Sequence, residues 1–182
     1  MSYARASLLA LAIALWGSRA RASDLSTVEG EHTDDLAAPY HALELSASGA
    51  SLLSFHQGSH AFVGAGLSAT VPIVSHQIEF ELVAHVMRGE HETVVPIDFL
   101  LRHPFILGRV VHPYLGIGPT LIPVVGESGT TTLEWGVASA YGIDFWVTPK
   151  FALFFELSMN AIEPVDRAAI ETGLALGPVV AF

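Results

Sequence analysis

The sequence predicts an all-β protein, an eight-stranded antiparallel up-and-down transmembrane β-barrel, and two observations support this. From Ala169 to Phe182, residues alternate with period two between a bulky apolar face and a face of mostly Gly and Ala. The small residues suit the interior of a narrow barrel, and the bulky ones suit contact with lipid. In addition, the chain after residue 22 has no apolar run long enough for a membrane-spanning helix, which leaves the closed barrel.

The N-terminal residues have the composition of a signal peptide. A basic start from Met1 to Arg5 precedes an apolar run from Ala6 to Trp16, and Ala20-Arg21-Ala22 is an A-x-A cleavage site. The apolar run is short for a membrane helix, although an N-terminal anchor helix is the alternative. We therefore predict a signal peptide at 1–22, a flexible acidic periplasmic lead-in at 23–39 and an outer-membrane β-barrel at 40–182.

The charge balance restricts the possible partners. Cleavage would leave five basic side chains against eighteen acidic ones, a net charge of −13 with neutral histidines. This argues against binding to nucleic acid or to an anionic surface. Hydrophobic residues nonetheless make up 51% of the chain, which suits a protein whose apolar residues face lipid. Disulfides would be permitted in the periplasm, but the chain has no cysteine.

Eight segments have the alternation expected of strands and are separated by turn signals. In chain order they are Tyr40–Ser48, Ala61–Val71, His76–Val86, Thr93–Arg102, His112–Ile122, Glu134–Val147, Phe151–Asn160 and Ala169–Phe182. In the first four, the outward-facing residues are Leu43, Leu45, Ala47, Val63, Ala65, Leu67, Ile78, Phe80, Leu82, Ala84, Val86, Val95, Ile97, Phe99 and Leu101. In the last four they are Leu115, Ile117, Leu121, Trp135, Val137, Tyr141, Ile143, Phe145, Phe151, Leu153, Phe155, Leu157, Met159, Ile170, Leu174, Leu176, Pro178, Val180 and Phe182.

The connections also suit a membrane barrel, which has short periplasmic turns and longer outer loops. Thr148-Pro149-Lys150 is a tight turn, whereas Ser48–His60 and Gly126–Leu133 are longer and polar. The long apolar connection His103–Val111 is the exception. An even number of strands puts both termini in the periplasm.

Three prolines fall inside the predicted strands, namely Pro96, Pro119 and Pro178. Each removes a hydrogen bond from the ladder, and a closed barrel has no free edge that could accommodate a proline. We therefore expect β-bulges at these positions.

The chain from Tyr40 to Phe182 resembles a small eight-stranded bacterial outer-membrane barrel, similar to the OmpA transmembrane domain and OmpX-type proteins. The strand pattern, the terminal Phe182 on the lipid-facing side and the Asp144–Phe151 turn carry the resemblance. It implies location in the cell outer membrane of a Gram-negative bacterium and contact with outer-membrane lipids. It also implies that the barrel assembly machinery reads Phe182 as an assembly signal. Phe145, Phe151 and Phe182 at one rim and Trp135 at the other would form aromatic girdles.

Inward-facing charges form the first candidate site, a lumen charge network. Its members are Glu44, Glu79, Glu81, Asp98, Arg102, Asp144, Glu156 and Glu171. Because side chains fill the interior of an eight-stranded barrel, these groups would contact one another, with Arg102 as the permanent cation. We interpret them as a packed polar plug; a gated, cation-preferring conductance is the alternative. A turn at Arg88–His91 would place Asp98 near Glu81 and Arg102 diagonal to Glu79, so that Arg102 bridges one of the two glutamates.

The histidines and one serine raise the question of metal binding and of catalysis. His56, His60 and His91 fall in predicted outer loops, where their spacing does not imply the three or four converging ligands of a zinc site, so we predict no metal and no cofactor. Some outer-membrane barrels remove acyl chains from lipid A with a His-x-Ser pair on the penultimate strand. Here the corresponding residues are Glu156-Leu157-Ser158, and a carboxylate of ordinary pKa is a poor base for a serine.

The sequence therefore favours a non-enzymatic outer-membrane β-barrel that is structural or interacts through its extracellular loops. One alternative is a barrel enzyme resembling a lipid A acyl hydrolase. The other is a secreted soluble barrel resembling a lipocalin, which would need an apolar interior and a polar exterior.

Overall fold

The computed structural model describes residues 41–55, 60–74, 77–163 and 169–182. The strands are β1 (Glu44–Ser54), β2 (His60–Val74), β3 (Ile78–Arg88), β4 (Glu92–Val94), β5 (Ile97–Pro104), β6 (Val111–Gly126), β7 (Thr131–Thr148), β8 (Phe151–Glu163) and β9 (Ala169–Ala181). The predicted signal peptide and lead-in lie outside these residues, as do Tyr40, His56 and His76. No helix in the described ranges is long and apolar enough to cross a membrane.

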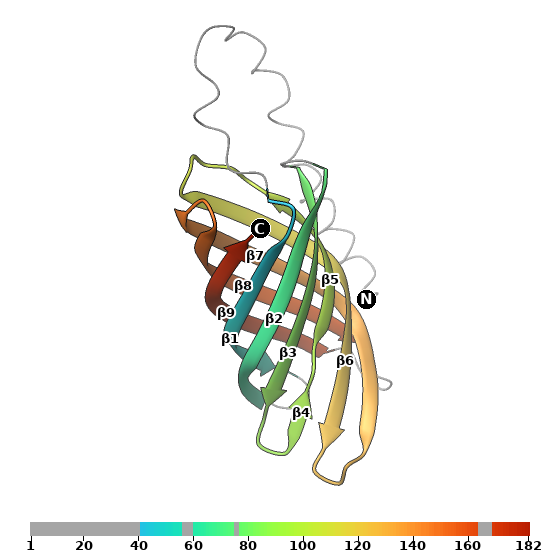
Figure 1. Ribbon diagram of the computed structural model, residues 1–182. Coiled ribbons are helices and arrows are strands. Elements are labelled where there is room, and N and C mark those ends of the chain that lie inside the picture. Colours follow the sequence, from blue (N-terminus) through green and yellow to red (C-terminus); the bar gives the residue numbers. More distant parts are fainter. Residues whose placement is uncertain (1–40, 56–59, 75–76, 164–168) are drawn as a thin grey trace, which may run out of the picture. The chain divides into compact units, whose positions relative to one another are not determined.

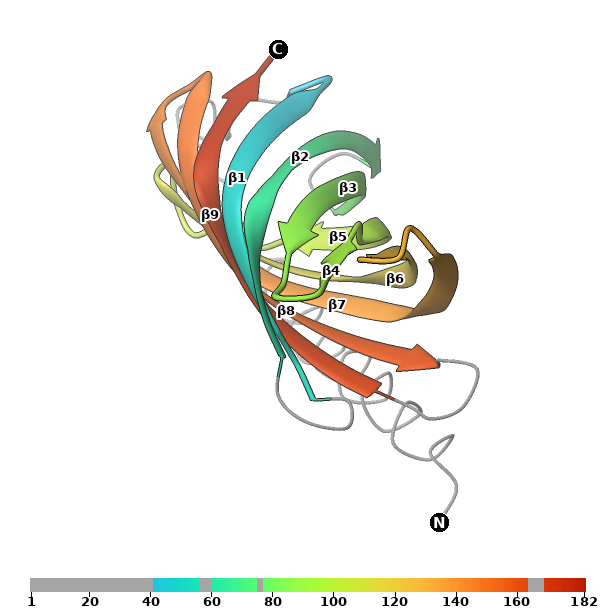
Figure 2. The ribbon, with the colours of Figure 1, turned by 90° about the horizontal axis from the view of Figure 1, so that it is seen from below.

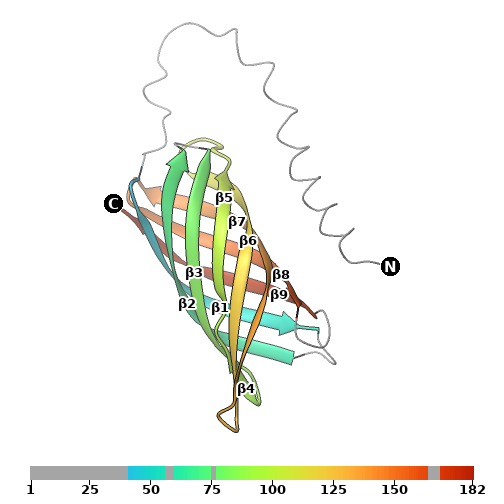
Figure 3. The ribbon, with the colours of Figure 1, turned by 90° about the vertical axis from the view of Figure 1, so that its right-hand side faces the viewer.

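These strands form one closed antiparallel ring. Neighbouring strands of the ring are hydrogen-bonded, and β9 pairs with β1 to complete the circuit. Strands β4 and β5 share one position, because both lie between β3 and β6. The nine strands therefore build an eight-stranded barrel, and the predicted fold class is confirmed. Figures 1 and 3 show the tilted strands from two sides, and Figure 2 shows them from below.

The barrel has two distinct ends. Strand β1 begins and β9 ends at the same rim, where the backbone of Phe182 hydrogen-bonds to Ala42 and Leu43. We call this rim the periplasmic end, as the even number of strands predicts. The opposite rim, called the outer end, contains the β3–β4 and β6–β7 turns, which lie close together in Figures 1 and 3.

The exterior is apolar, as the alternation predicted. Large hydrophobic side chains are exposed on every full-length strand of the ring. They include Leu45, Val63, Leu67, Leu82, Val86, Leu101, Ile117, Val137, Tyr141, Leu153, Phe155, Leu157, Leu174 and Leu176. Exposed Phe145, Phe151 and Phe182 lie at the periplasmic end, and exposed Trp135 lies at the outer end. This exterior is the reverse of the polar surface that a soluble lipocalin-like barrel requires.

The lumen is layered rather than polar throughout. A layer built around Trp146, with Ala152, Val179 and Ala181, fills the periplasmic end, and Phe154 packs against it. Buried charged residues come next. The outer half contains an apolar cluster of Leu52, Phe62, Met87, Val94, Ile122, Ile162 and Ala169. The expected plug is therefore not polar throughout, because the outer half combines this apolar cluster with only a few buried polar residues, such as Asn160 and Glu171.

The prediction of β-bulges at the three prolines is wrong. Pairing continues in unchanged register before and after Pro96, Pro119 and Pro178, and the missing pairs are those of each proline and of the residue before it. A glycine precedes two of them, and a Cβ on either Gly118 or Gly177 would lie 1.8 Å from a carbonyl oxygen of the neighbouring strand. Proline has no N–H to donate to the carbonyl of the neighbouring strand. This carbonyl therefore approaches the Cα of the preceding glycine instead. The described bulges are elsewhere, at Pro72–Val74 and Trp146–Thr148.

The first outer connection is also shorter than predicted. Ser48–His60 was expected to be a polar loop, but β1 continues to Ser54, which pairs with His60. In this half of β1, Gly49 and Ser51 face outward and Leu52 faces the apolar layer. Alternation does not reveal this half of the strand, because the small Gly49 and Ser51 face outward with Leu53 while the large Leu52 faces inward, which blurs the pattern seen in the other strands.

Candidate functional site

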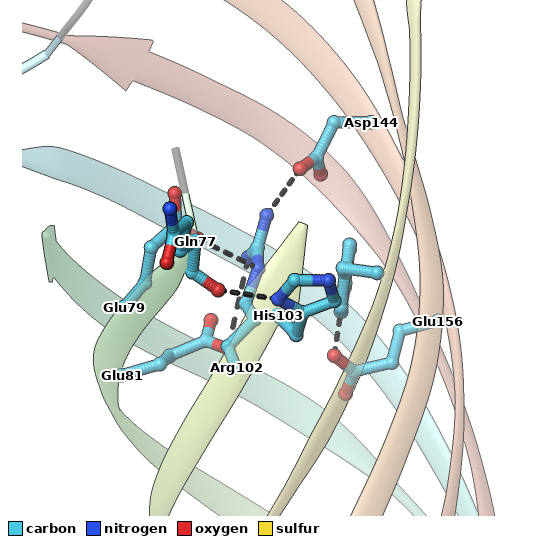
Figure 4. Close-up of polar contacts among 8 residues, drawn as sticks. Gln77, Glu79, Glu81, Arg102, His103, Asp144 and Glu156 are labelled. Carbon is cyan, nitrogen blue, oxygen red and sulfur yellow. Dashed lines mark hydrogen bonds and ion pairs between the residues drawn. The ribbon is translucent and has the colours of Figure 1, made fainter. Parts of the chain in front are cut away.

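The charged middle layer of the lumen is centred on Arg102. This side chain projects inward from β5 and is buried, with 7% of its side-chain surface exposed. Its Nε lies 3.2 Å from Oε2 of Glu79 and its Nη1 lies 3.7 Å from Oε2 of Glu81, both on β3. Its Nη2 donates a hydrogen bond to Oδ2 of Asp144 on β7. Figure 4 shows the guanidinium among these three carboxylates.

The pairing of β3 with β5 explains this arrangement and corrects the predicted register. Glu79 lies directly opposite Arg102, and Asp98 lies opposite Val83 instead of near Glu81. The turn is centred one residue further along the chain than predicted, since the Gly89 N–H donates to the Glu92 carbonyl at 2.9 Å. Gly89 thus directly follows β3, where this hydrogen bond to Glu92 holds it, and it lies against the Phe62 ring. The one-residue shift of the centre moves the pairing by two residues, so the predicted inward faces are unchanged.

Tyr114 is the central residue that the sequence reading missed. The Arg102 guanidinium carbon lies 3.6 Å from the centre of the Tyr114 ring, a cation–π contact. The Tyr114 hydroxyl donates to Oε2 of Glu156 at 2.8 Å. Tyr114 lies opposite Gly142 on β7, where a Cβ would lie 2.1 Å from the ring. The sequence contains a signal for this packing, because Tyr114 and Gly142 are a large aromatic residue and a glycine on the inward faces of the two strands of one hairpin, β6 and β7.

The remaining predicted members fall into separate groups. Glu44 lines a cavity of about 10 Å³ beside Arg102 and Asp144, which has room for about one water molecule. Asp98 is four residues along β5 from Arg102, roughly 13 Å away in an extended strand. Glu171 lies at the outer end, opposite Asn160 on β8. Of the eight predicted residues, the structure therefore places Glu79, Glu81 and Asp144 around Arg102, and it connects Glu156 through Tyr114.

The described histidines and Ser158 have ordinary surroundings. His85 is hydrogen-bonded to Ser48 at 3.1 Å, and His91 lies 3.3 Å from Glu127 at the outer rim. Among the residues that the structure describes, no group of three or more His, Asp or Glu side chains is arranged to hold a metal ion. Ser158 packs beside Gly173, and the neighbouring Glu156 accepts its hydrogen bond from Tyr114.

Similar folds are found among solved structures of bacterial surface proteins. Neisserial surface protein A is 19% identical, with a TM-score of 0.69, over 79% of this chain and 99% of that chain. The chain has the fold of a small outer-membrane β-barrel. OprG of Pseudomonas aeruginosa is 13% identical, with a TM-score of 0.58 (79% and 97% covered). Ail, the attachment invasion locus protein of Yersinia pestis, is 12% identical, with a TM-score of 0.56 (78% and 99% covered).

No protein-family model and no curated protein sequence matches this barrel. The fold, together with the apolar exterior, places the barrel in the cell outer membrane, as the sequence predicted.

Proposed function

We propose that this protein is a non-enzymatic outer-membrane barrel with a closed lumen, which acts through the surface it presents at its outer end. The single observation that carries the proposal is the packing around Arg102. A guanidinium held by three carboxylates and an aromatic ring occupies the middle of the lumen, and the adjoining cavity has a volume of only about 10 Å³. A conducting pore would need a continuous water-filled path at this level.

The apolar layers on both sides of the charges support the same proposal. Trp146 and its neighbours fill the periplasmic end, and the cluster that includes Phe62 and Ile122 fills the outer half. Ions that crossed the lumen would have to enter both layers, which is costly because an unpaired charge loses its hydration there. A cation-preferring pore, which is the alternative that the sequence leaves open, is therefore less favoured than a closed barrel.

The geometry also favours a non-enzymatic role. A serine nucleophile needs a base within hydrogen-bond reach. Among the described contacts, Ser158 has no hydrogen bond to a histidine or a carboxylate, and the carboxylate two residues away is hydrogen-bonded to Tyr114.

A barrel with a closed lumen and no catalytic site would interact with partners through the loops at its outer end. One solved structure of Ail contains the heparin analogue sucrose octasulfate; the acidic outer end of this barrel, with Glu90, Glu92 and Glu127, argues against a polyanionic ligand here.

Reconstitution into planar bilayers tests the closed lumen. The wild-type barrel should insert without stepwise conductance in 1 M KCl, whereas Arg102→Gly should increase the frequency of brief openings. The same preparation, incubated with lipid A, should release no fatty acid. Stable conductance steps from the wild-type barrel, or release of fatty acid that Ser158→Ala abolishes, would contradict the proposal.

A further inference from the structure

A second cavity lies at the outer end of the barrel, above the apolar layer. Its volume is about 610 Å³, within the range typical of small-molecule sites. Phe62, Val94 and Ile122, each at most 3% exposed, form its floor. A floor of this kind offers contact to an apolar group and no ligand to a strongly hydrated ion.

The walls of the cavity are acidic. Glu90 comes from the β3–β4 turn, Glu92 from the start of β4, Glu134 from β7 and Glu171 from β9. No arginine or lysine is among the described residues that line it. Four carboxylates from separate parts of the barrel therefore create a negative potential over an apolar surface, which attracts cations.

Glu171 provides an independent sign of a ligand. It is only 6% exposed and it lines the cavity. Ser54 and Asn160 hydrogen-bond to its carboxyl group, but its Oε2 atom has no hydrogen-bond partner. A buried carboxylate oxygen is costly when it lacks a partner, so a positively charged or hydrogen-bonding ligand in the cavity would relieve this cost.

The arrangement of the carboxylates distinguishes between kinds of cation. Calcium takes six to eight oxygen ligands at short distances. Among the described residues, no three His, Asp or Glu side chains converge in that way. Dispersed carboxylates above a hydrophobic floor fit a bulky cation with weak hydration, such as an organic ammonium ion that carries an apolar group.

We propose that the outer cavity binds a small organic ammonium cation, with its charged head beside Glu171 and its apolar body on the floor formed by Phe62, Val94 and Ile122. This inference rests on the proposed function only in that the outer end must be open to the outside of the cell. The proposed ligand of the outer end of the barrel is thus an organic ammonium cation.

The test is isothermal titration of the full barrel, purified from outer membranes in octyl glucoside, with benzyltrimethylammonium. We expect saturable binding that is about tenfold tighter than that of tetramethylammonium, because the benzyl group adds buried apolar area. Benzyl alcohol and benzenesulfonate should bind more weakly than benzyltrimethylammonium by at least about tenfold, since neither carries a positive charge.

Variants locate the site. Glu171→Gln should weaken binding of benzyltrimethylammonium by about tenfold, and the partly exposed Glu92→Gln should weaken it by about threefold. Glu163→Gln is the matched control, because this exposed glutamate at the outer end of β8 does not line the cavity, and it should leave binding unchanged. Each variant is first checked for slower gel migration after boiling than before, which shows that the barrel is folded.

Several results would overturn the inference. They are an absence of binding to the folded barrel, equal binding of benzyl alcohol, equal loss of affinity in Glu163→Gln, or displacement of the probe by stoichiometric Ca²⁺. The proposed function fails separately, if the purified barrel conducts ions or cleaves lipid A.

Discussion

Glu79 and Arg102 lie directly opposite each other on strands β3 and β5, with Oε2 of the glutamate 3.2 Å from Nε of the arginine. The pair lies between the apolar layers at the two ends of the lumen. Arg102 also contacts Glu81, Asp144 and the Tyr114 ring, so its loss would leave several buried carboxylates without a cation.

Arg102→Ala should therefore lower the free energy of unfolding strongly, by about 3–5 kcal/mol for a dry site. The measurement is refolding in detergent micelles across a urea series for Arg102→Ala, Glu79→Ala and the double variant. We expect a coupling energy above about 0.5 kcal/mol, since the two side chains share one contact. Simple additivity of the two single changes would show that the ion pair is not formed.

Tyr114→Phe should lower the free energy of unfolding by about 1–3 kcal/mol, because Glu156 would lose its hydrogen bond within the lumen. Tyr141→Phe is the matched control. Tyr141 is 48% exposed on the exterior of the neighbouring strand β7, so the same loss of a hydroxyl should change stability little. Equal effects in the two variants would rule out a specific role for the Tyr114 hydroxyl.

Gly142→Ala should be strongly destabilising, because its Cβ would lie 2.1 Å from the Tyr114 ring. Overpacking of this kind costs about 1–3 kcal/mol. Gly49→Ala provides the comparison, since a Cβ there meets nothing within 4 Å. Urea unfolding should show Gly49→Ala at or above wild-type stability and Gly142→Ala well below it, and Tyr114→Leu should restore part of the loss.

The sequence could predict the strand faces because two unlike environments surround the barrel wall. Lipid selects bulky residues such as Leu153 and Phe155, and a narrow lumen selects small or charged residues such as Ala152 and Glu156. This contrast is sharp in β8 and β9 and weak in the outer half of β1, where Leu52 faces inward. The apolar outer layer of the lumen, and with it the true end of β1, was therefore not predictable from alternation.

The sequence predicts which side chains of the site face the lumen but not which of them touch. The alternation along each strand puts Arg102, Glu79 and Asp144 in the lumen. Contact between them depends on the register of the strands, and that register changed because the turn is centred one residue further along the chain, at Glu90. The cavity at the outer end was missed because its walls come from β3–β4, β7 and β9, which are far apart in the chain.

Deletion of Phe182 should reduce the amount of inserted barrel without changing synthesis, if the assembly machinery reads this residue. The Phe182 side chain is 64% exposed, so its loss should cost little in the folded barrel. Phe145→Ala removes another exposed aromatic residue at the same end and should leave insertion near the wild-type level. Quantitative immunoblots of outer-membrane fractions measure both variants, and normal insertion without Phe182 would contradict its assignment as an assembly signal.

The most direct test of the membrane barrel is the gel migration of the protein from fractionated cells, before and after boiling. The full chain should sediment with outer membranes and should migrate faster before boiling than after, because a closed barrel of paired strands resists unfolding by detergent at room temperature. Recovery of the protein as a soluble periplasmic species, with identical migration in both samples, would contradict the membrane barrel and everything inferred from it.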